Sequence, residues 1–279
     1  MKTFRLLLTS FVIGAGLILT GCDHIHDPNG RSFPPTPPEN IRAYAGDNIV
    51  DIYWDPNPER DVAGYNIYYS YSYDGKYTLI GTTQSTHFAD AGANNGDTYY
   101  YAVTAFDYDG NESDLSKDVV YSTPRPQGSN VALFDYNTVP DNAGYYFKGY
   151  LVVPYNDNRA DIFFENYNGT YYVDVWAADT DIQDMGPTQD IYDIPTAPSG
   201  GWIPAQTGEN IKYAEAKVGH TYVIWTHDNH YAKIRISSIT SQRMVFDWVY
   251  QLQEGNRELK RNINSSFRNN MPIQVERKF

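Results

Sequence analysis

The stretch Tyr99-Tyr100-Tyr101-Ala102-Val103-Thr104-Ala105 decides the fold, because apolar side chains occupy every second position along it. Successive side chains of a β-strand point to opposite faces of a sheet, so this period of two predicts a strand with one buried face. Shorter alternating runs surround Trp54 and Tyr65. None of the runs between residues 41 and 124 has a convincing apolar period of 3.6, so we expect strands throughout.

Clusters of turn-forming residues separate these predicted strands at regular intervals. The clusters are Asp55–Pro58, Asp74-Gly75, Asn94–Gly96 and Asp109–Asn111. Short strands with such punctuation are typical of a β-sandwich. We therefore predict a first all-β domain over residues 41–124.

This segment resembles a fibronectin type III domain. The resemblance rests on Trp54, on Asp61–Tyr68, on the alternation from Tyr99 to Ala105 and on Gly110–Ser113. It implies that Trp54 belongs to the core, and Tyr65 is a further structural signature residue of the matching segment. It also implies that Tyr99 is the tyrosine-corner residue, whose hydroxyl bonds back to the main chain. Such domains usually space or present other domains, and the resemblance implies no catalysis.

The N-terminus predicts export and a lipid anchor. Lys2 and Arg5 precede an apolar run that ends at Leu19, which is the pattern of a secretory signal over residues 1–21. Leu19-Thr20-Gly21-Cys22 resembles a bacterial lipobox, which implies cleavage before Cys22 and attachment of diacylglyceryl and palmitate-type chains to it. The alternative is a plain secretory signal with an incidental cysteine. We expect a protein anchored in the bacterial cell envelope, with inner and outer membrane both open.

Residues 22–40 are polar and rich in proline, with Pro28, Pro34, Pro35, Pro37 and Pro38. Proline favours extended polyproline geometry, so we predict a semi-rigid tether that lifts the folded part off the membrane. Thr123–Asn130 is a second stretch of turn formers with little apolar mass. It predicts a domain boundary, with residues 125–130 as the linker.

The charge balance excludes nucleic acid as a partner. The net charge is −13, and removal of the signal would take away two basic residues and no acid, giving −15. Phosphate backbones require a basic surface. The single cysteine also means that no disulfide forms within the chain, so each domain depends on its apolar core.

A second antiparallel β domain is predicted over residues 131–253. Met244, Phe246, Trp248 and Tyr250 line one face of its last strand. Two strands on either side of Asp228-Asn229 form a predicted hairpin with a two-residue turn. Residues 179–208 look loop-like. The basic segment 254–279 carries a net charge of +3 and is expected to be a flexible tail.

The second domain resembles the HmuY-like family of lipidated all-β surface proteins. The matching residues are Asp161–Phe163, Ala197–Trp202, Gly219–Tyr222, Tyr231–Ile236 and Phe246–Gln251. The family's haem capture through two histidines implies a haem cofactor, although no matching histidine pair can be placed on this sequence.

His227 and His230 flank the predicted turn, so we consider them as ligands of a metal or of haem iron. The alternative is an exposed polar turn without any cofactor.

Three functions compete. The first is a non-enzymatic, membrane-anchored protein whose second domain binds a protein, a glycan or a small ligand through loop aromatics such as Trp202 and Tyr192. The second is capture of haem or metal by the two histidines. The third is an envelope glycan hydrolase with Asp161 or Glu165 as acid or base, although no established catalytic motif occurs. We favour the first.

Overall fold

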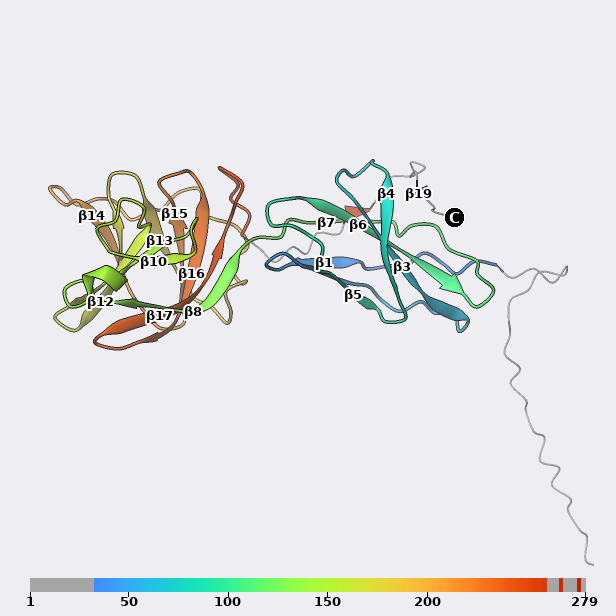
Figure 1. Cartoon of the computed structure of the whole chain (residues 1–279), viewed down its shortest axis with the longest axis horizontal. Coiled ribbons are helices and arrows are strands. Elements are labelled where there is room, and N and C mark those ends of the chain that lie inside the picture. The colour runs from blue at the N-terminus through green and yellow to red at the C-terminus, as the bar shows by residue number, and fades with distance from the viewer. Residues whose placement is uncertain (1–32, 260–265, 268–274, 277–279) are drawn as a thin grey trace, which may run out of the picture. The chain divides into compact units, whose positions relative to one another are not determined.

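The computed structural model describes residues 33–259, 266–267 and 275–276 (Figure 1). The predicted signal, the Cys22 lipidation site and the first part of the tether lie outside the described residues. The chain divides into two units, residues 1–33 and residues 34–279, and the second contains all the strands. Within the described part, no helix is long and apolar enough to cross a bilayer. The described chain is all-β, as predicted.

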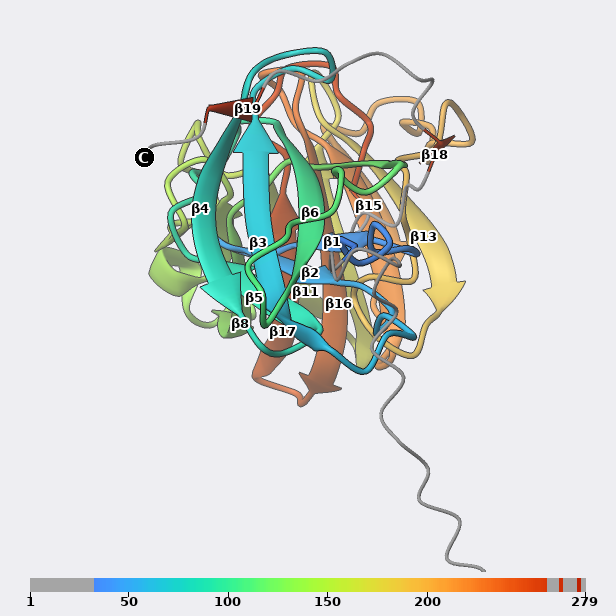
Figure 2. The same cartoon turned by 90° about the vertical axis from the view of Figure 1, so that its right-hand side faces the viewer.

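The first sandwich packs a sheet of order β1-β2-β5 against one of order β7-β6-β3-β4. Figure 2 shows β4, β3 and β6 side by side. Antiparallel pairing joins neighbouring strands in both sheets. The strands are β1 (Arg42–Ala45), β2 (Val50–Tyr53), β3 (Val62–Ser70), β4 (Tyr77–Thr83), β5 (His87–Asp90), β6 (Tyr99–Asp107) and β7 (Asp118–Ser122).

The residues that carry the fibronectin resemblance occupy its core. Trp54 is 2% exposed and its ring packs edge-on against Tyr65, with the centroids 5.2 Å apart. The Tyr99 hydroxyl accepts a hydrogen bond from the backbone N–H of Asn94 at 2.9 Å. This contact five residues back along the chain is what the resemblance implies for a tyrosine corner.

The second sandwich packs a sheet of order β10-β9-β11-β12-β14 against one of order β13-β15-β16-β17-β8. Inward residues of both sheets form one core, which includes Phe164, Val173, Ile234 and Phe246. Its elements are β8 (Gln127–Phe134), the 3₁₀ turn η1 (Pro140–Asn142), β9 (Gly144–Tyr146), β10 (Leu151–Val153), β11 (Ile162–Tyr167), β12 (Thr170–Trp176), β13 (Asp181–Pro187), β14 (Ile211–Glu215), β15 (His220–Trp225), β16 (Tyr231–Ile239) and β17 (Arg243–Tyr250).

Three predicted segments differ from the structure. Pro35 and Pro38 are buried, and Thr36 N–H donates to Glu59 Oε1 at 2.8 Å, so the end of the tether packs as part of the folded unit. In the linker, strand β8 already begins at Gln127. The backbone of Arg125, just before it, donates to Gly46 O at 3.1 Å.

The predicted tail also contributes to structure. Backbone hydrogen bonds fix its first residues, for example from Leu259 N–H to Pro195 O at 2.8 Å. Two short strands follow, β18 (Ser266–Phe267) and β19 (Val275–Glu276). They add to the two edges of the larger sheet of the first sandwich, β18 beside β7 and β19 beside β4. These residues, which were expected to be flexible, are therefore held by backbone pairing with the first sandwich.

Candidate functional site

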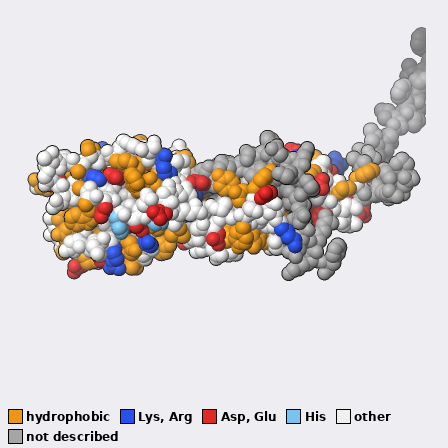
Figure 3. Space-filling model, turned by 90° about the horizontal axis from the view of Figure 1, so that it is seen from above, with side chains coloured by type: hydrophobic (Ala, Val, Ile, Leu, Met, Phe, Trp, Pro, Cys, Tyr) orange, Lys and Arg blue, Asp and Glu red, His pale blue; other side chains and the backbone are white. Residues whose placement is uncertain are grey.

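Two regions of the second sandwich contain the predicted site residues. The first is the outer face of the sheet β13-β15-β16-β17-β8, which the loop of residues 188–206 covers; we call it the loop-covered face. The second is the tip of the hairpin between β15 and β16. On the face of the molecule drawn in Figure 3, hydrophobic side chains lie in several separate groups among charged ones. The two regions are therefore recognised by their buried and half-buried side chains and not by a concentration of charge on the surface.

Trp202 belongs to an aromatic cluster on the loop-covered face. Trp225 and Tyr231 are cross-strand partners in β15 and β16, and their rings stack with centroids 5.7 Å apart. The loop brings Trp202 to 6.0 Å from Trp225 and 6.4 Å from Tyr231. Tyr231 is buried, whereas both indoles are half-buried. The cluster thus retains aromatic surface that a ligand can contact.

Tyr192, the other loop aromatic predicted to contact a ligand, is held by contacts within the second sandwich. Its hydroxyl donates to Gln127 Oε1 at 2.9 Å, and its ring lies 5.7 Å from the ammonium of Lys233. Lys233 is 0% exposed and donates to Ile194 O at 2.8 Å. Burial, with a smaller effect from Arg125, lowers the pKa of Lys233 to about 7. Tyr192 therefore covers a buried lysine that nothing in the sequence pattern pointed to.

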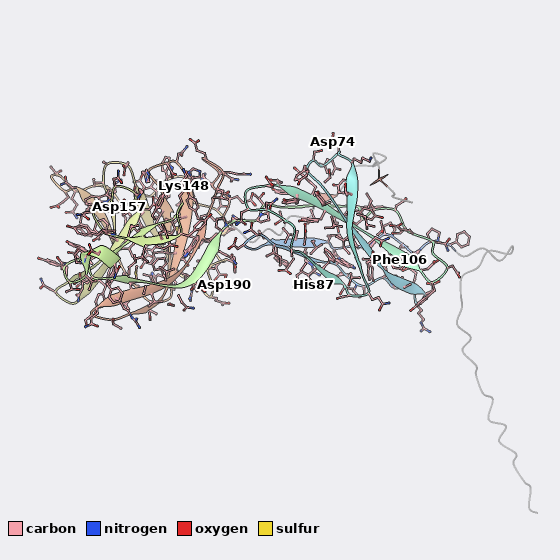
Figure 4. The ribbon with its side chains drawn as sticks, in the orientation of Figure 1. Asp74, His87, Phe106, Lys148, Asp157 and Asp190 are labelled. Carbon is pink, nitrogen blue, oxygen red and sulfur yellow. The ribbon has the colours of Figure 1, made fainter. Side chains whose placement is uncertain are left out.

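The loop that carries both aromatics is tied down at its far side. Ala197 N–H donates to Arg257 O at 2.8 Å, and the guanidinium of Arg257 donates back to Ala197 O. Thr196 and Glu258 form a β-bridge. Asp190, labelled in Figure 4, accepts from the N–H of Tyr192 at 2.6 Å. These bonds give the aromatic cluster a fixed backbone, which a binding site on a long loop needs.

The hairpin tip differs from the predicted two-residue turn. Trp225 pairs with Tyr231, and Asn229 N–H donates to Thr226 O at 3.0 Å. Asn229 has a φ of +62°, which matches a three-residue hairpin loop whose last residue is left-handed. The extra residue means that His227 and His230 are not cross-strand partners.

Each histidine faces a different carboxylate. His227 Nδ1 is 3.1 Å from Asp161 Oδ1, and this hydrogen bond raises the pKa of His227. His230 Nδ1 lies 3.1 Å from Asp228 Oδ1, an ion-pair distance without hydrogen-bond geometry, and its ring packs against Tyr250 at 5.6 Å. Asp228 also accepts from Lys148 at 3.2 Å; Lys148 is labelled in Figure 4.

These two His–Asp pairs do not fit a haem held between two imidazoles. His230 is largely buried, with its side chain 13% exposed, and packs against Tyr250. Within the described residues, no group of three or more histidine, cysteine or acidic side chains could hold a metal ion. What the tip offers instead is a single imidazole, that of His227, oriented by the buried Asp161.

The two carboxylates considered for hydrolysis are held by different partners. Asp161, just before β11, is 2% exposed; it accepts from Phe147 N–H at 2.9 Å as well as from His227. Burial raises the pKa of Asp161. Glu165, within β11, accepts from the Tyr136 hydroxyl at 2.9 Å. The structure therefore joins Asp161 to His227, which sequence reasoning treated as separate candidates.

Sequence reasoning missed Asp174 and Lys233. Each follows the alternation of its strand and lies opposite inward core residues, so the pattern alone places both in solvent. Both are 0% exposed because segments distant in the sequence cover them. The sequence gives a signal for Asp174 alone, which has large aromatic residues at the second position on both sides, Tyr172 and Trp176.

Comparisons with known proteins match limited parts of the chain. No family model matches it. An amylopullulanase of Thermoanaerobacterium saccharolyticum is 34% identical over 126 residues, which are 43% of this chain and 10% of the relative. The amylopullulanase of Thermoanaerobacter thermohydrosulfuricus is 36% identical over 120 residues, which are 42% of this chain and 8% of the relative. The chain thus corresponds to about a tenth of these relatives' length.

Among solved structures, an Fn3-like protein from Clostridium thermocellum is 28% identical, with 33% of this chain and 96% of that one covered and a TM-score of 0.29. A β-1,2-glucanase from Parabacteroides distasonis is 32% identical, with 34% and 13% covered and a TM-score of 0.30. Strand order, the buried Trp54 and the Tyr99 contact support a fibronectin type III-like domain as the first sandwich.

Proposed function

We propose that the protein is a non-enzymatic, lipid-anchored cell-envelope protein in which the fibronectin type III-like sandwich spaces a β-rich domain that binds a glycan. The observation that carries the proposal is the pair of half-buried indoles, Trp202 and Trp225, on the loop-covered face. An indole joins a broad apolar ring to one N–H donor, and that combination suits the faces and hydroxyls of a sugar. Trp225 Nε1 already donates to Asn229 Oδ1 at 3.0 Å, which fixes the ring.

A glycan is favoured over a protein or a small ligand for two reasons. Three of the relatives that match part of this chain are named amylopullulanases, and a fourth is named a Kelch domain-containing protein. The aromatic cluster is small and lies on a sheet face, where a sugar ring can stack, rather than in an extended apolar surface of the kind that protein partners bury. The relatives match through a small part of their length, so their catalytic activity is not carried over.

The remaining elements of the proposal concern position. Cys22 would carry the lipid and hold the chain at a membrane of the bacterial cell envelope. The order along the sequence is anchor, proline-rich segment, first sandwich and second sandwich. This order supports an arrangement in which the glycan-binding domain is separated from the lipid by the first sandwich.

Affinity electrophoresis of the purified protein through gels that contain pullulan, starch or β-1,2-glucan tests the binding function. We expect at least one polysaccharide to retard the protein. Trp202→Ala and Trp225→Ala should weaken retardation about tenfold, as loss of an aromatic hot spot does. Trp202→Phe should keep most of it, because a ring remains.

Trp176→Ala is the matched control, since Trp176 is also half-buried but lies on the other sheet of the second sandwich. Its retardation should equal that of the unsubstituted protein. Thermal melts accompany every variant. Unchanged retardation in both Trp202→Ala and Trp225→Ala, or no retardation of the unsubstituted protein by any of the three polysaccharides, contradicts the proposal.

A further inference from the structure

Asp174 lies in the middle of the outer face of the sheet β10-β9-β11-β12-β14. Its neighbours in β12, Val173 and Val175, belong to the core, so alternation directs Asp174 to the opposite face. It is nevertheless 0% exposed, and neither carboxylate oxygen has a hydrogen-bond partner among the described residues. A buried carboxylate without donors is costly, so this position needs an explanation.

Aromatic side chains surround this carboxylate on the sheet. Phe163 of β11 and Tyr213 of β14 are its two cross-strand partners. Tyr172 and Trp176 lie two residues before and after it on the same face of β12. The ring centroids of Phe163 and Trp176 are 5.2 Å apart, and those of Tyr172 and Tyr213 are 5.4 Å apart. Asp174 thus forms the floor of a box of four rings, which we call the aromatic box.

Two further rings approach the aromatic box from outside the sheet. Tyr136 follows β8 and Tyr155 follows β10, and they stack on each other with centroids 4.8 Å apart. Both also pack against Phe163, at 5.7 and 5.8 Å. Both lie outside the strands, and the Tyr136 hydroxyl donates to Glu165 Oε1 at 2.9 Å. A small molecule would reach the buried carboxylate only after these two rings turn aside.

The charged side chains at the outward positions of β11, β12 and β14 are all acidic. Glu165 accepts from the Tyr136 hydroxyl, and Glu215 pairs with Lys217 at 2.9 Å at the end of β14. The outward positions of β11, β12 and β14 hold no basic residue. The titratable groups on the elements packed around Asp174 are therefore Glu165 and the tyrosines Tyr136, Tyr155, Tyr172 and Tyr213. Burial, and to a smaller extent Glu165, raises the pKa of Asp174 to about 8.

We propose that the aromatic box binds an organic cation, a protonated amine or a quaternary ammonium group, with Asp174 as its counter-ion. Aromatic faces attract cations through their ring quadrupole, and the attraction grows when the site is desolvated. A cation supplies the opposite charge that the unpartnered carboxylate lacks. This site lies on the other sheet from the loop-covered face, so it does not depend on glycan binding.

Binding should be coupled to release of a proton from Asp174. At pH 7 the carboxyl is mostly protonated in the free protein, and a bound cation stabilises its charged form. Apparent affinity should therefore rise about tenfold from pH 6 to pH 7 and level off above pH 8. This pH profile distinguishes an ion pair with Asp174 from stacking alone.

Isothermal titration of the purified protein with choline chloride tests the inference, with 3,3-dimethyl-1-butanol as the uncharged molecule of the same shape. We expect binding of choline, strongest at pH 8 to 9, and at least tenfold weaker binding of the alcohol. Asp174→Asn should abolish choline binding, and Trp176→Ala should weaken it. Glu215→Gln, on the same face but paired with Lys217, should leave it unchanged.

Equal affinity for choline and the alcohol overturns the inference, because the site would then recognise shape and apolar surface alone. Choline binding that persists in Asp174→Asn, or absence of choline binding between pH 6 and 9, also overturns it. Far-ultraviolet circular dichroism of each variant shows that the fold is retained. Polysaccharide retardation of Asp174→Asn should equal that of the unsubstituted protein, which separates this site from the glycan-binding face.

Discussion

Asp174→Asn should stabilise the second sandwich at neutral pH. The folded-state pKa of Asp174 is about 8, against 3.8 for an unperturbed aspartate. The folded protein therefore holds the proton more tightly than the unfolded chain, and stability falls as pH rises from 3.8 to 8. From pH 3.8 to pH 7 is about 3 pH units. At 1.36 kcal/mol per unit, the free energy of unfolding falls by about 4 kcal/mol over this range.

Asparagine has the same shape and cannot ionise, so the variant escapes this loss. The variant should match the unsubstituted protein near pH 4 and exceed it by about 4 kcal/mol at pH 7, a large part of the stability of an ordinary domain. Its unpartnered amide costs free energy, as the protonated carboxyl does, but that cost does not change with pH. The difference should level off above pH 8.

Urea unfolding between pH 4 and pH 9, followed by tryptophan fluorescence, measures this effect. Four of the five tryptophans lie in the second sandwich, so the signal reports mainly on that domain. Glu165→Gln serves as a graded control: it removes the neighbouring charge, lowers the pKa of Asp174, and should end the fall in stability at a lower pH. Parallel pH profiles for Asp174→Asn and the unsubstituted protein would refute the reasoning.

Three other predictions concern separate parts of the chain. Tyr99→Phe leaves the Asn94 N–H without its acceptor and should destabilise the first sandwich by about 1 to 3 kcal/mol. Urea unfolding measures this, and a urea midpoint equal to that of the unsubstituted protein would contradict it. His227 should titrate above 6.5 by NMR and return toward that value in Asp161→Asn, because its hydrogen bond to the Asp161 carboxylate raises its pKa. Cys22→Ser should move the protein from the membrane to the soluble fraction on cell fractionation, with both sandwiches folded; retention in the membrane would contradict lipidation at Cys22.

The alternation of apolar residues predicted the first sandwich well, because its core residues are close neighbours along each strand. Tyr99, Tyr101 and Val103 are all at most 3% exposed, as a period of two requires. Strand β13, Asp181-Ile182-Gln183-Asp184-Met185-Gly186-Pro187, lies inside the segment expected to be a loop. Its polar residues and glycine predict a turn, but pairing with β15 outweighs that local preference.

The candidate site was harder to predict because its contacts join distant segments. Asp161 and His227 are 66 residues apart and meet only when the end of the hairpin reaches the start of β11. The length of the turn determines whether the two histidines lie opposite each other. One added residue places Asn229 in a left-handed conformation, so His227 and His230 are not cross-strand partners. Trp202 could be named as a loop aromatic, yet its partners Trp225 and Tyr231 depend on how the loop folds over the sheet.

On its two outer faces the second sandwich buries an acid, Asp174, and a base, Lys233, and their effects on stability fall in different pH ranges. Lys233 has a folded-state pKa of about 7 against an ordinary 10.5, so the folded state holds fewer protons and stability rises from pH 7 to 10.5. Asp174 lowers stability up to pH 8. Together these two groups place a minimum of stability between pH 7 and 8.

Lys233→Met should remove the rise above that minimum. Methionine fills the buried space without a charge, so the variant should be more stable than the unsubstituted protein at pH 7, and its advantage should shrink toward pH 10. Because the two residues lie on different sheets, their effects should add, and Asp174→Asn/Lys233→Met should show the flattest profile. Urea midpoints at pH 5, 7 and 9 measure this. If the double variant keeps a minimum near neutral pH, other groups control the pH dependence of the second sandwich.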